Sequence, residues 1–148
     1  MHFDDFQVGR IFKSPARLVS AEDIQAYAAL TGDMNPLHFD DNYAVRVGYK
    51  GRIAHGMLVF GLGAGRWYAM DLTKESTVAL LGFGKVAFRA PVYPGDGIRL
   101  LSEVVSCRPS ETRPGSGIVT FKDAVMNQDG EEVLTFERKL MLKTATTK

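Results

Sequence analysis

The chain of 148 residues is long enough to bury a hydrophobic core, so we expect a single domain over residues 1–148. Its 18 basic and 17 acidic residues give a formal net charge of +1 and are scattered along the length. This charge pattern argues against a nucleic acid or a membrane surface as a partner.

Cysteine and histidine usage limits the chemistry further. The single cysteine, Cys107, excludes an internal disulfide and is typical of a reducing compartment. The three histidines occur without C-x-x-C or H-E-x-x-H spacing, which predicts that the protein has no metal site. Residues 1–12 lack the pattern of a secretory signal, and the apolar run from Met57 to Met70 is too short to span a bilayer comfortably. We therefore expect a soluble, cytoplasmic protein.

The first predicted elements are a strand around Ile11 to Val19 and a helix that follows it. Ser20 precedes the helix as an N-cap, and Asp23 lies three positions on, close to a capping box. Apolar or small residues then recur at spacings of three, four and seven, at Ile24, Tyr27, Ala28 and Thr31. The pattern predicts a helix that buries one face and aims the loop after it.

That loop carries the main candidate residues, Asp33 and His38. Pro36 fixes its own φ and favours extended backbone at Asn35, so the segment is predicted to be a bent loop. A bend can bring the carboxylate and the imidazole together, which is the pair needed to take a proton at one point and deliver one at another. The alternative is that Asp33 and Asn35 are ordinary turn residues and His38 is a core histidine.

A second short helix is predicted through Ala44 to Val47, with Asp40 as its cap. Three basic residues, Arg46, Lys50 and Arg52, lie in it or in the glycine-containing stretch that follows. They form either a solvated loop or a site for phosphate groups, which Lys and Arg suit.

The stretch from Gly56 to about Ala69 is apolar on nearly every side, so a helix there should be enclosed by the protein. Gly61, Gly63 and Gly65 each cost roughly 1 kcal/mol relative to Ala inside a helix. We therefore expect a sheet or a ligand to approach this helix closely.

The rest of the chain reads as strands separated by turn signals. They are Thr77 to Gly82, Lys85 to Val92, Ile98 to Cys107, Gly117 to Asn127 and Glu132 to Lys143. The last two are predicted to form a hairpin across Gln128-Asp129-Gly130. Arg138 falls on the inward-facing parity of the last strand, which requires either an interface or an acidic partner. One apolar helix with five or six antiparallel strands indicates a curved sheet wrapped around that helix.

Four blocks in chain order resemble the MaoC-like family of (R)-specific enoyl-CoA hydratases and related acyl dehydratases. They are Phe3 to Gly9 (FDDFQVG), Gly32 to His38 (GDMNPLH), His55 to Leu58 (HGML) and Phe88 to Asp96 (FRAPVYPGD). Tyr27 and Ala44 match the aromatic and small positions that flank the second block. From the first to the last, the blocks span residues 3–96, which is most of the chain.

The resemblance implies an α+β hot-dog domain, in which an antiparallel sheet wraps around a central apolar helix, and a homodimer or higher homo-oligomer. It implies a hydro-lyase of fatty acid metabolism, an enoyl-CoA hydratase or 3-hydroxyacyl dehydratase. Such an enzyme interconverts trans-2-enoyl and (R)-3-hydroxyacyl thioesters of coenzyme A or of an acyl carrier protein. No cofactor is expected beyond the carrier of the substrate, because hydration of an activated alkene needs only acid–base groups and carbonyl polarisation.

The resemblance also assigns roles to residues. Asp33 would activate the water, and His38 would hold the same water and protonate the α-carbon, although a coupled pair can exchange roles. Asn35 would orient the pair. Gly56 would polarise the thioester carbonyl through its N–H, since the first N–H groups of a helix lack intrahelical partners and carry the positive end of the dipole. His55 beside it is predicted to be a structural cap or loop contact.

Other assignments concern substrate binding. Arg46, Lys50 and Arg52 would meet the phosphates of the carrier, unless they are only solvated. Gly61 stands where well-known hydratases of the family have a serine, which leaves the substrate range open. Trp67 either belongs to the core or lines an acyl tunnel.

Two other functions remain open. A thioesterase could use Asp33 as a base on water that attacks the carbonyl, because hot-dog domains host more than one chemistry. A non-catalytic acyl-binding subunit of a larger complex would need neither group.

Overall fold

The computed structural model describes residues 1–145. The helical segments are η1 (Phe3–Asp5), α1 (Ala21–Thr31), η2 (Pro36–His38), α2 (Asp41–Arg46) and α3 (Gly56–Tyr68). The strands are β1 (Ile11–Lys13), β2 (Arg17–Leu18), β3 (Thr77–Phe88), β4 (Gly97–Pro109), β5 (Ser116–Met126) and β6 (Glu132–Lys143). None of the helices in this part of the chain has the length and apolar character needed to cross a membrane.

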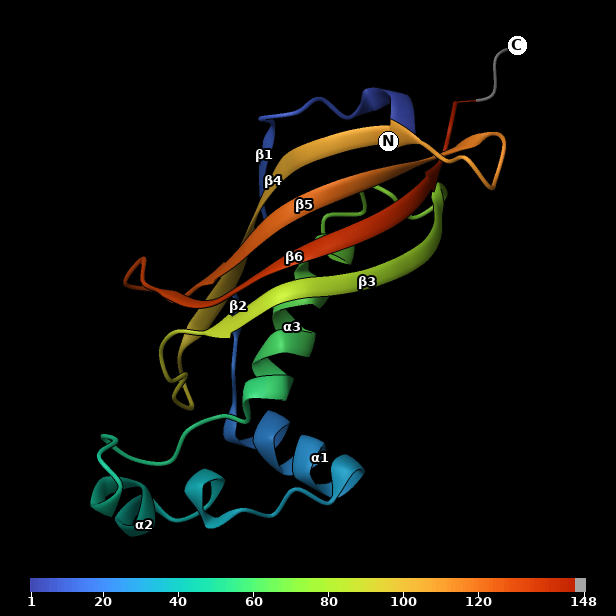
Figure 1. The fold of residues 1–148 in the computed structure, drawn as a ribbon. Helices are drawn as coiled ribbons and strands as arrows, with labels where there is room; N and C mark the ends of the chain where they lie inside the picture. The colour runs from blue at the N-terminus through green and yellow to red at the C-terminus, as the bar shows by residue number, and fades with distance from the viewer. Residues whose placement is uncertain (146–148) are drawn as a thin grey trace.

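The strands form one antiparallel sheet in the order β1-β4-β5-β6-β3, and β2 pairs with β4 outside this path. The sheet curves over α3, and α1 and α2 lie beyond the N-terminal end of α3 (Figure 1). This confirms the expected antiparallel sheet around an apolar helix. The predicted β5–β6 hairpin is also confirmed, with Gly130 in the left-handed region at φ 76° in the turn.

Two strand boundaries differ from the sequence predictions. The runs Thr77 to Gly82 and Lys85 to Val92 were expected as two strands, but β3 is one strand that ends at Phe88, short of Val92, because the residues from Gly82 to Gly84 also pair with β6. Register shifts and a positive φ at Lys85 accommodate the irregularity within one strand. The expected strand over Ile11 to Val19 divides into β1 and β2 around Pro15, which has no N–H to donate to a neighbour.

The start of α1 has the predicted capping box. The Ser20 hydroxyl accepts from the Asp23 N–H at 3.1 Å, and the Asp23 carboxylate accepts from the Ser20 N–H at 2.9 Å. Arg17 forms two further hydrogen bonds to the Asp23 carboxylate, and these bonds lower the pKa of Asp23 to about 2. The helix ends at Gly32, whose φ of 79° turns the chain into the loop.

α3 buries one face against the sheet. Val59, Gly63 and Trp67 are buried, whereas Met57 and Tyr68 are 57% and 47% exposed. The expectation that the protein encloses this helix on all sides is therefore wrong for the single chain. Close approach of the sheet does explain Gly63, since a Cβ there would lie 2.5 Å from a Val125 methyl.

The acidic partner of Arg138 is Asp123 on β5. The Arg138 Nε donates to Asp123 Oδ2 at 2.6 Å, and Ser102 bonds both side chains. The guanidinium carbon lies 4.6 Å from the centre of the Trp67 ring and 4.5 Å from that of Phe121. This buried cluster of Arg138, Asp123 and Ser102 joins β4, β5 and β6 beneath α3.

Candidate active site

The loop between α1 and η2 is shaped by Asn35 and Pro36. The Asn35 side chain accepts a hydrogen bond from the Leu37 N–H at 2.9 Å, and Pro36 begins η2. This turn directs His38 inward, where its side chain is buried, and leaves Asp33 exposed. The Asn35 N–H also donates to one carboxylate oxygen of Asp33 at 3.3 Å. Asn35 thus forms hydrogen bonds on both sides of the turn, to Asp33 before it and to Leu37 after it.

The ring of His38 is fixed by the backbone that leads into α3. Its Nδ1 lies 2.8 Å from the Ile53 carbonyl oxygen. A carbonyl oxygen only accepts, so Nδ1 carries a proton in this contact. The Nε2 atom is then the nitrogen that can receive or release a proton in the site.

His55 was expected to cap α3 or to contact the loop, and the structure shows the second. It occupies the N-cap position, but its side chain makes no capping hydrogen bond. Its Nε2 instead lies 3.0 Å from the backbone oxygen of Asp33, and its ring stacks on His38 with centroids 3.8 Å apart. His55 therefore joins the two segments that carry the predicted pair.

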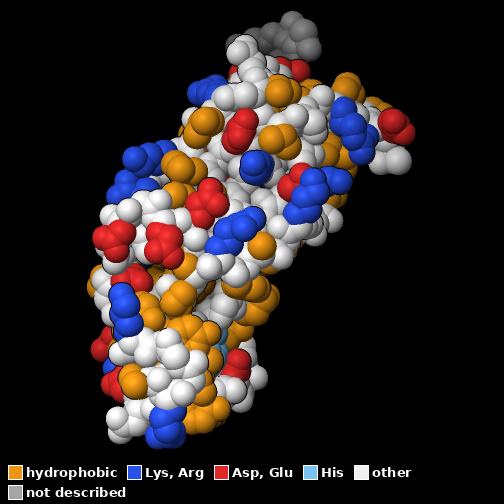
Figure 2. Space-filling view, turned by 60° about the vertical axis from the view of Figure 1, so that its left-hand side comes forward, with side chains coloured by type: hydrophobic (Ala, Val, Ile, Leu, Met, Phe, Trp, Pro, Cys, Tyr) orange, Lys and Arg blue, Asp and Glu red, His pale blue; other side chains and the backbone are white. Residues whose placement is uncertain are grey.

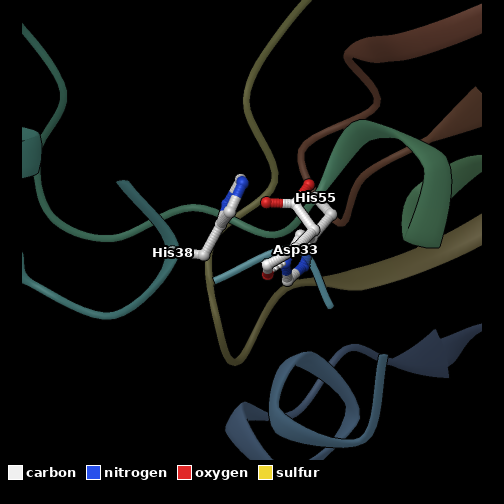
Figure 3. Close-up of side chains that lie close together, drawn as sticks. All are labelled: Asp33, His38 and His55. Carbon is white, nitrogen blue, oxygen red and sulfur yellow. Dashed lines mark hydrogen bonds between the residues drawn. The ribbon is translucent and has the colours of Figure 1, made fainter. Parts of the chain in front are cut away.

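Asp33, His38 and His55 meet although they belong to three segments of the chain (Figure 3). A carboxylate oxygen and one nitrogen of each ring all lie within 4.8 Å of one another. Within the described residues this is the place where carboxylate and imidazole groups gather in this way. The arrangement can hold one water and move protons at two points of a substrate.

The same donor types suit a divalent transition metal. One nitrogen of each ring contacts a backbone carbonyl, which leaves the His38 Nε2 and the His55 Nδ1 as the nitrogens that could bind one. The same nitrogens and the Asp33 carboxylate can equally serve acid–base chemistry. The prediction that the protein has no metal site stays a prediction.

Gly56, the first residue of α3, borders a pocket of about 240 Å³. Its N–H has no intrahelical acceptor and carries the positive end of the helix dipole. Apolar side chains form much of the pocket wall, including Ile53, Val59 and Phe88. The Phe88 ring passes so close to Gly56 that a Cβ there would lie 3.0 Å from it. The pocket therefore reaches the start of α3, but Asp33, His38 and His55 are not among the residues that line it.

The structure places the other predicted site residues as follows. Arg46 and Lys50 are exposed on α2 and the loop after it, and neither forms an ion pair within residues 1–145. Arg52 is half-buried in the same loop. Gly61 faces open space on α3, since a Cβ added there would have no neighbouring atom within 4 Å among the described residues.

Trp67 requires a correction. Its side chain is fully buried, its Nε1 donates to the Thr73 hydroxyl at 2.9 Å, and its ring packs on Phe121 with centroids 4.7 Å apart. Trp67 faces the sheet because it shares the face of α3 that carries Val59 and Gly63. The structure assigns it to the core, not to an acyl tunnel.

Sequence and structure comparisons place this geometry among known proteins. The profile of the MaoC like domain family matches residues 5–125. The chain is 34% identical over 107 residues to a mitochondrial 3-hydroxyacyl-[acyl-carrier-protein] dehydratase of Arabidopsis thaliana, covering 72% of this chain and 61% of the plant protein. It is 30% identical over 142 residues to the (R)-specific enoyl-CoA hydratase of Aeromonas caviae, and the match covers 96% of this chain and 99% of that enzyme.

Among solved structures, the MaoC-like dehydratase of Rhodospirillum rubrum aligns with a TM-score of 0.87 at 26% identity, covering 99% of both chains. The family match spans most of the chain, and the fold agrees with it. The chain belongs to the MaoC-like domain family and has the hot-dog fold.

Proposed function

We propose that this protein interconverts trans-2-enoyl thioesters and (R)-3-hydroxyacyl thioesters by adding or removing water. The observation that carries the proposal is the meeting of the Asp33 carboxylate with the imidazoles of His38 and His55, of which His55 directly precedes the first residue of α3. A hydratase needs a base, an acid and a donor for the thioester oxygen, and Asp33, His38 and the Gly56 N–H would supply one of each.

In the hydration direction, Asp33 takes a proton from water while the water oxygen bonds to the β-carbon of the enoyl group. The electron pair of the double bond moves toward the thioester oxygen, where the Gly56 N–H stabilises the developing enolate. The proton then passes from the Asp33 carboxyl to Nε2 of His38, and His38 delivers it from Nε2 to the α-carbon, which restores both groups. A carboxylate oxygen of Asp33 and a ring nitrogen of His38 lie within 4.8 Å of each other, a gap that one water can bridge. Dehydration follows the same steps in reverse.

The carrier of the acyl group is proposed to be coenzyme A or the phosphopantetheine of an acyl carrier protein. Arg46, Lys50 and Arg52 lie on the segment that joins His38 to Gly56, and two residues of this segment, Tyr49 and Ile53, line the pocket. Arg46 and Lys50 are exposed cations without a carboxylate partner within residues 1–145, as a phosphate-binding role requires.

We also propose that the protein is a homodimer or a higher homo-oligomer. β3 is an edge strand of the sheet, and Leu80, Leu81, Val86 and Phe88 on it are 44–54% exposed. Hydrophobic side chains also gather toward the end of the molecule that holds α1 and α2, whereas charged ones are spread over the sheet (Figure 2). An exposed apolar edge and the open face of α3 would both be covered by a second copy.

Absorbance of the conjugated enoyl thioester tests the function directly. We expect crotonyl-CoA or longer trans-2-enoyl-CoAs to lose this absorbance with the wild-type protein, and Asp33→Asn and His38→Ala to abolish the loss. Asp71→Asn is the matched control, because Asp71 has a positive φ that Asn tolerates and lies in the turn after α3. A thiol-trapping reagent in the same cuvette separates hydration from hydrolysis, since steady thiol release would establish a thioesterase instead.

A further inference from the structure

We infer that His55 is a positioning residue of the proposed hydratase site, which fixes the backbone of Asp33 and the ring of His38 relative to the start of α3. The inference rests on the proposed function for its catalytic meaning. Its structural basis is a pair of contacts: the His55 ring hydrogen-bonds to the backbone of Asp33 and stacks on the ring of His38. Within the described residues, no other side chain of the site makes both contacts.

The first contact fixes the position of Asp33. The Asp33 backbone oxygen can only accept, so the His55 Nε2, 3.0 Å away, must carry the proton. Asp33 lies in an exposed loop, and its carboxylate accepts a hydrogen bond from the Asn35 N–H of the same loop. The bond from His55, across 22 residues, ties the backbone of Asp33 to the start of α3.

The second contact fixes the ring of His38. The His55 ring packs against two others, with centroids 3.8 Å from His38 and 4.6 Å from Tyr27. Tyr27 belongs to α1, so the ring that stacks on His38 is held by its position at the start of α3 and by its contact with α1. Because the Ile53 carbonyl fixes the edge of His38 and His55 fixes its face, the ring has little freedom to rotate away from Asp33.

A purely structural histidine would account for this site less well. The side chain is 2% exposed, yet its Nδ1 has no hydrogen-bond partner. Leaving a buried acceptor unpaired lowers stability, so a contribution to stability does not account for this nitrogen. α3 also begins without a capping bond from this side chain, so helix capping does not explain it. The position of the His55 ring is explained by its contacts with both Asp33 and His38.

Three variants separate the two contacts. His55→Phe keeps a flat ring in the stack but loses the N–H. His55→Gln keeps an amide N–H that can reach the Asp33 carbonyl but loses the ring. His55→Ala loses both. We expect kcat of His55→Ala to fall by about 10²-fold, the effect typical of a small displacement in an active site, with KM within about twofold. His55→Phe and His55→Gln should each recover part of that loss.

A structural role alone would instead lower the melting temperature and leave the kcat of the folded fraction unchanged, and that result would overturn the inference. Equal kcat values for all three variants and the wild type would overturn it too.

An NMR spectrum of the imidazole nitrogens of the wild-type protein shows which nitrogen of each ring carries the proton, and this measurement does not depend on activity. With only three histidines, the signals are assigned by comparing the wild type with His55→Phe and His38→Ala. We expect His55 in the Nε2–H form with slow exchange of that proton, and His38 in the Nδ1–H form. The opposite tautomer at His55 would contradict the contact. If the wild type shows this spectrum but no hydration, the proposed function fails while the His55 contact stands.

Discussion

Two buried clusters of polar groups, one in the sheet and one at the start of α3, differ in how their charges are paired. In the sheet, Arg138 and Asp123 share two hydrogen bonds, and Ser102 bonds both of them. At the start of α3, His38 and His55 each use one nitrogen on a backbone carbonyl, and the His55 Nδ1 has no partner. One nitrogen of the first cluster, the Arg138 Nη1, also has no partner, but the charges of that cluster are paired with each other, whereas the second cluster lies beside an exposed carboxylate.

This difference separates polar groups that stabilise the fold from polar groups that are available for catalysis. A charge that is fully enclosed must be paired, because an unpaired buried charge would destabilise the protein. A catalytic group must keep a lone pair or a proton available to its substrate. Four predictions use this contrast.

The largest expected effect is on turnover at Asp33. Asp33→Asn removes the base but keeps the shape of an exposed side chain, so hydration should slow by about 10²–10⁴-fold. The melting temperature should be unchanged, since the side chain is not packed in the core. Turnover and thermal unfolding measured on the same preparation test this, and unchanged turnover would remove Asp33 from the mechanism.

In the sheet, substitution of Asp123 is expected to lower stability and leave turnover unchanged. Asp123→Asn leaves the buried Arg138 without its counter-ion, which should lower the free energy of unfolding by about 3–5 kcal/mol. The kcat of the folded fraction should not change. Glu137→Gln is the matched control, because its partner Lys85 is 77% exposed and an exposed pair contributes at most about 1 kcal/mol. Urea unfolding of both variants gives the comparison, and equal losses would contradict this account of the buried pair.

The two faces of α3 offer a smaller test. Gly63→Ala places a methyl 2.5 Å from Val125 and should destabilise the domain by about 1–3 kcal/mol. Gly61→Ala enters open space and should stabilise the helix by up to about 1 kcal/mol. The difference between the two melting temperatures measures how closely the sheet approaches the helix. If Gly61→Ala is as damaging as Gly63→Ala, a second copy of the chain covers that face.

The smallest expected effect concerns pH and the start of α1. Hydrogen bonds from Arg17 lower the pKa of Asp23 from 3.8 to about 2, so the folded state favours the ionised carboxylate. The stabilisation is present above the ordinary pKa and is lost as the pH falls through about 2. Urea midpoints of wild type and Asp23→Asn should therefore differ at pH 6 and converge toward pH 2. A constant difference over this range would contradict the assigned cause.

Much of the fold was predictable where the signals are local. The capping box at Ser20 and Asp23, the loop at Pro36, the span of α3 and the β5–β6 hairpin depend on residues that are neighbours in sequence. The site loop was predictable for the same reason, since Asp33 and His38 lie five residues apart around a proline. Resemblance to a known family supplied the roles of these residues.

The features that were missed depend on contacts between distant parts of the chain. Asp123 is 15 residues from Arg138, and only the register of β5 on β6 brings the two together. Continuity of β3 through Gly84 depends in the same way on its pairing with β6. The contact between His55 and Asp33 spans 22 residues and requires the loop to fold back on the start of α3. The position of His55 beside Gly56 was the only sequence signal for it.

The most direct test of the central claim is hydration of crotonyl-CoA in D₂O, followed by NMR of the product. The account predicts a 3-hydroxybutyryl thioester of R configuration with one deuterium at the α-carbon, formed by the wild type and not by Asp33→Asn or His38→Ala. Release of free coenzyme A with crotonate, or a product that the two variants form as fast as the wild type, would contradict it.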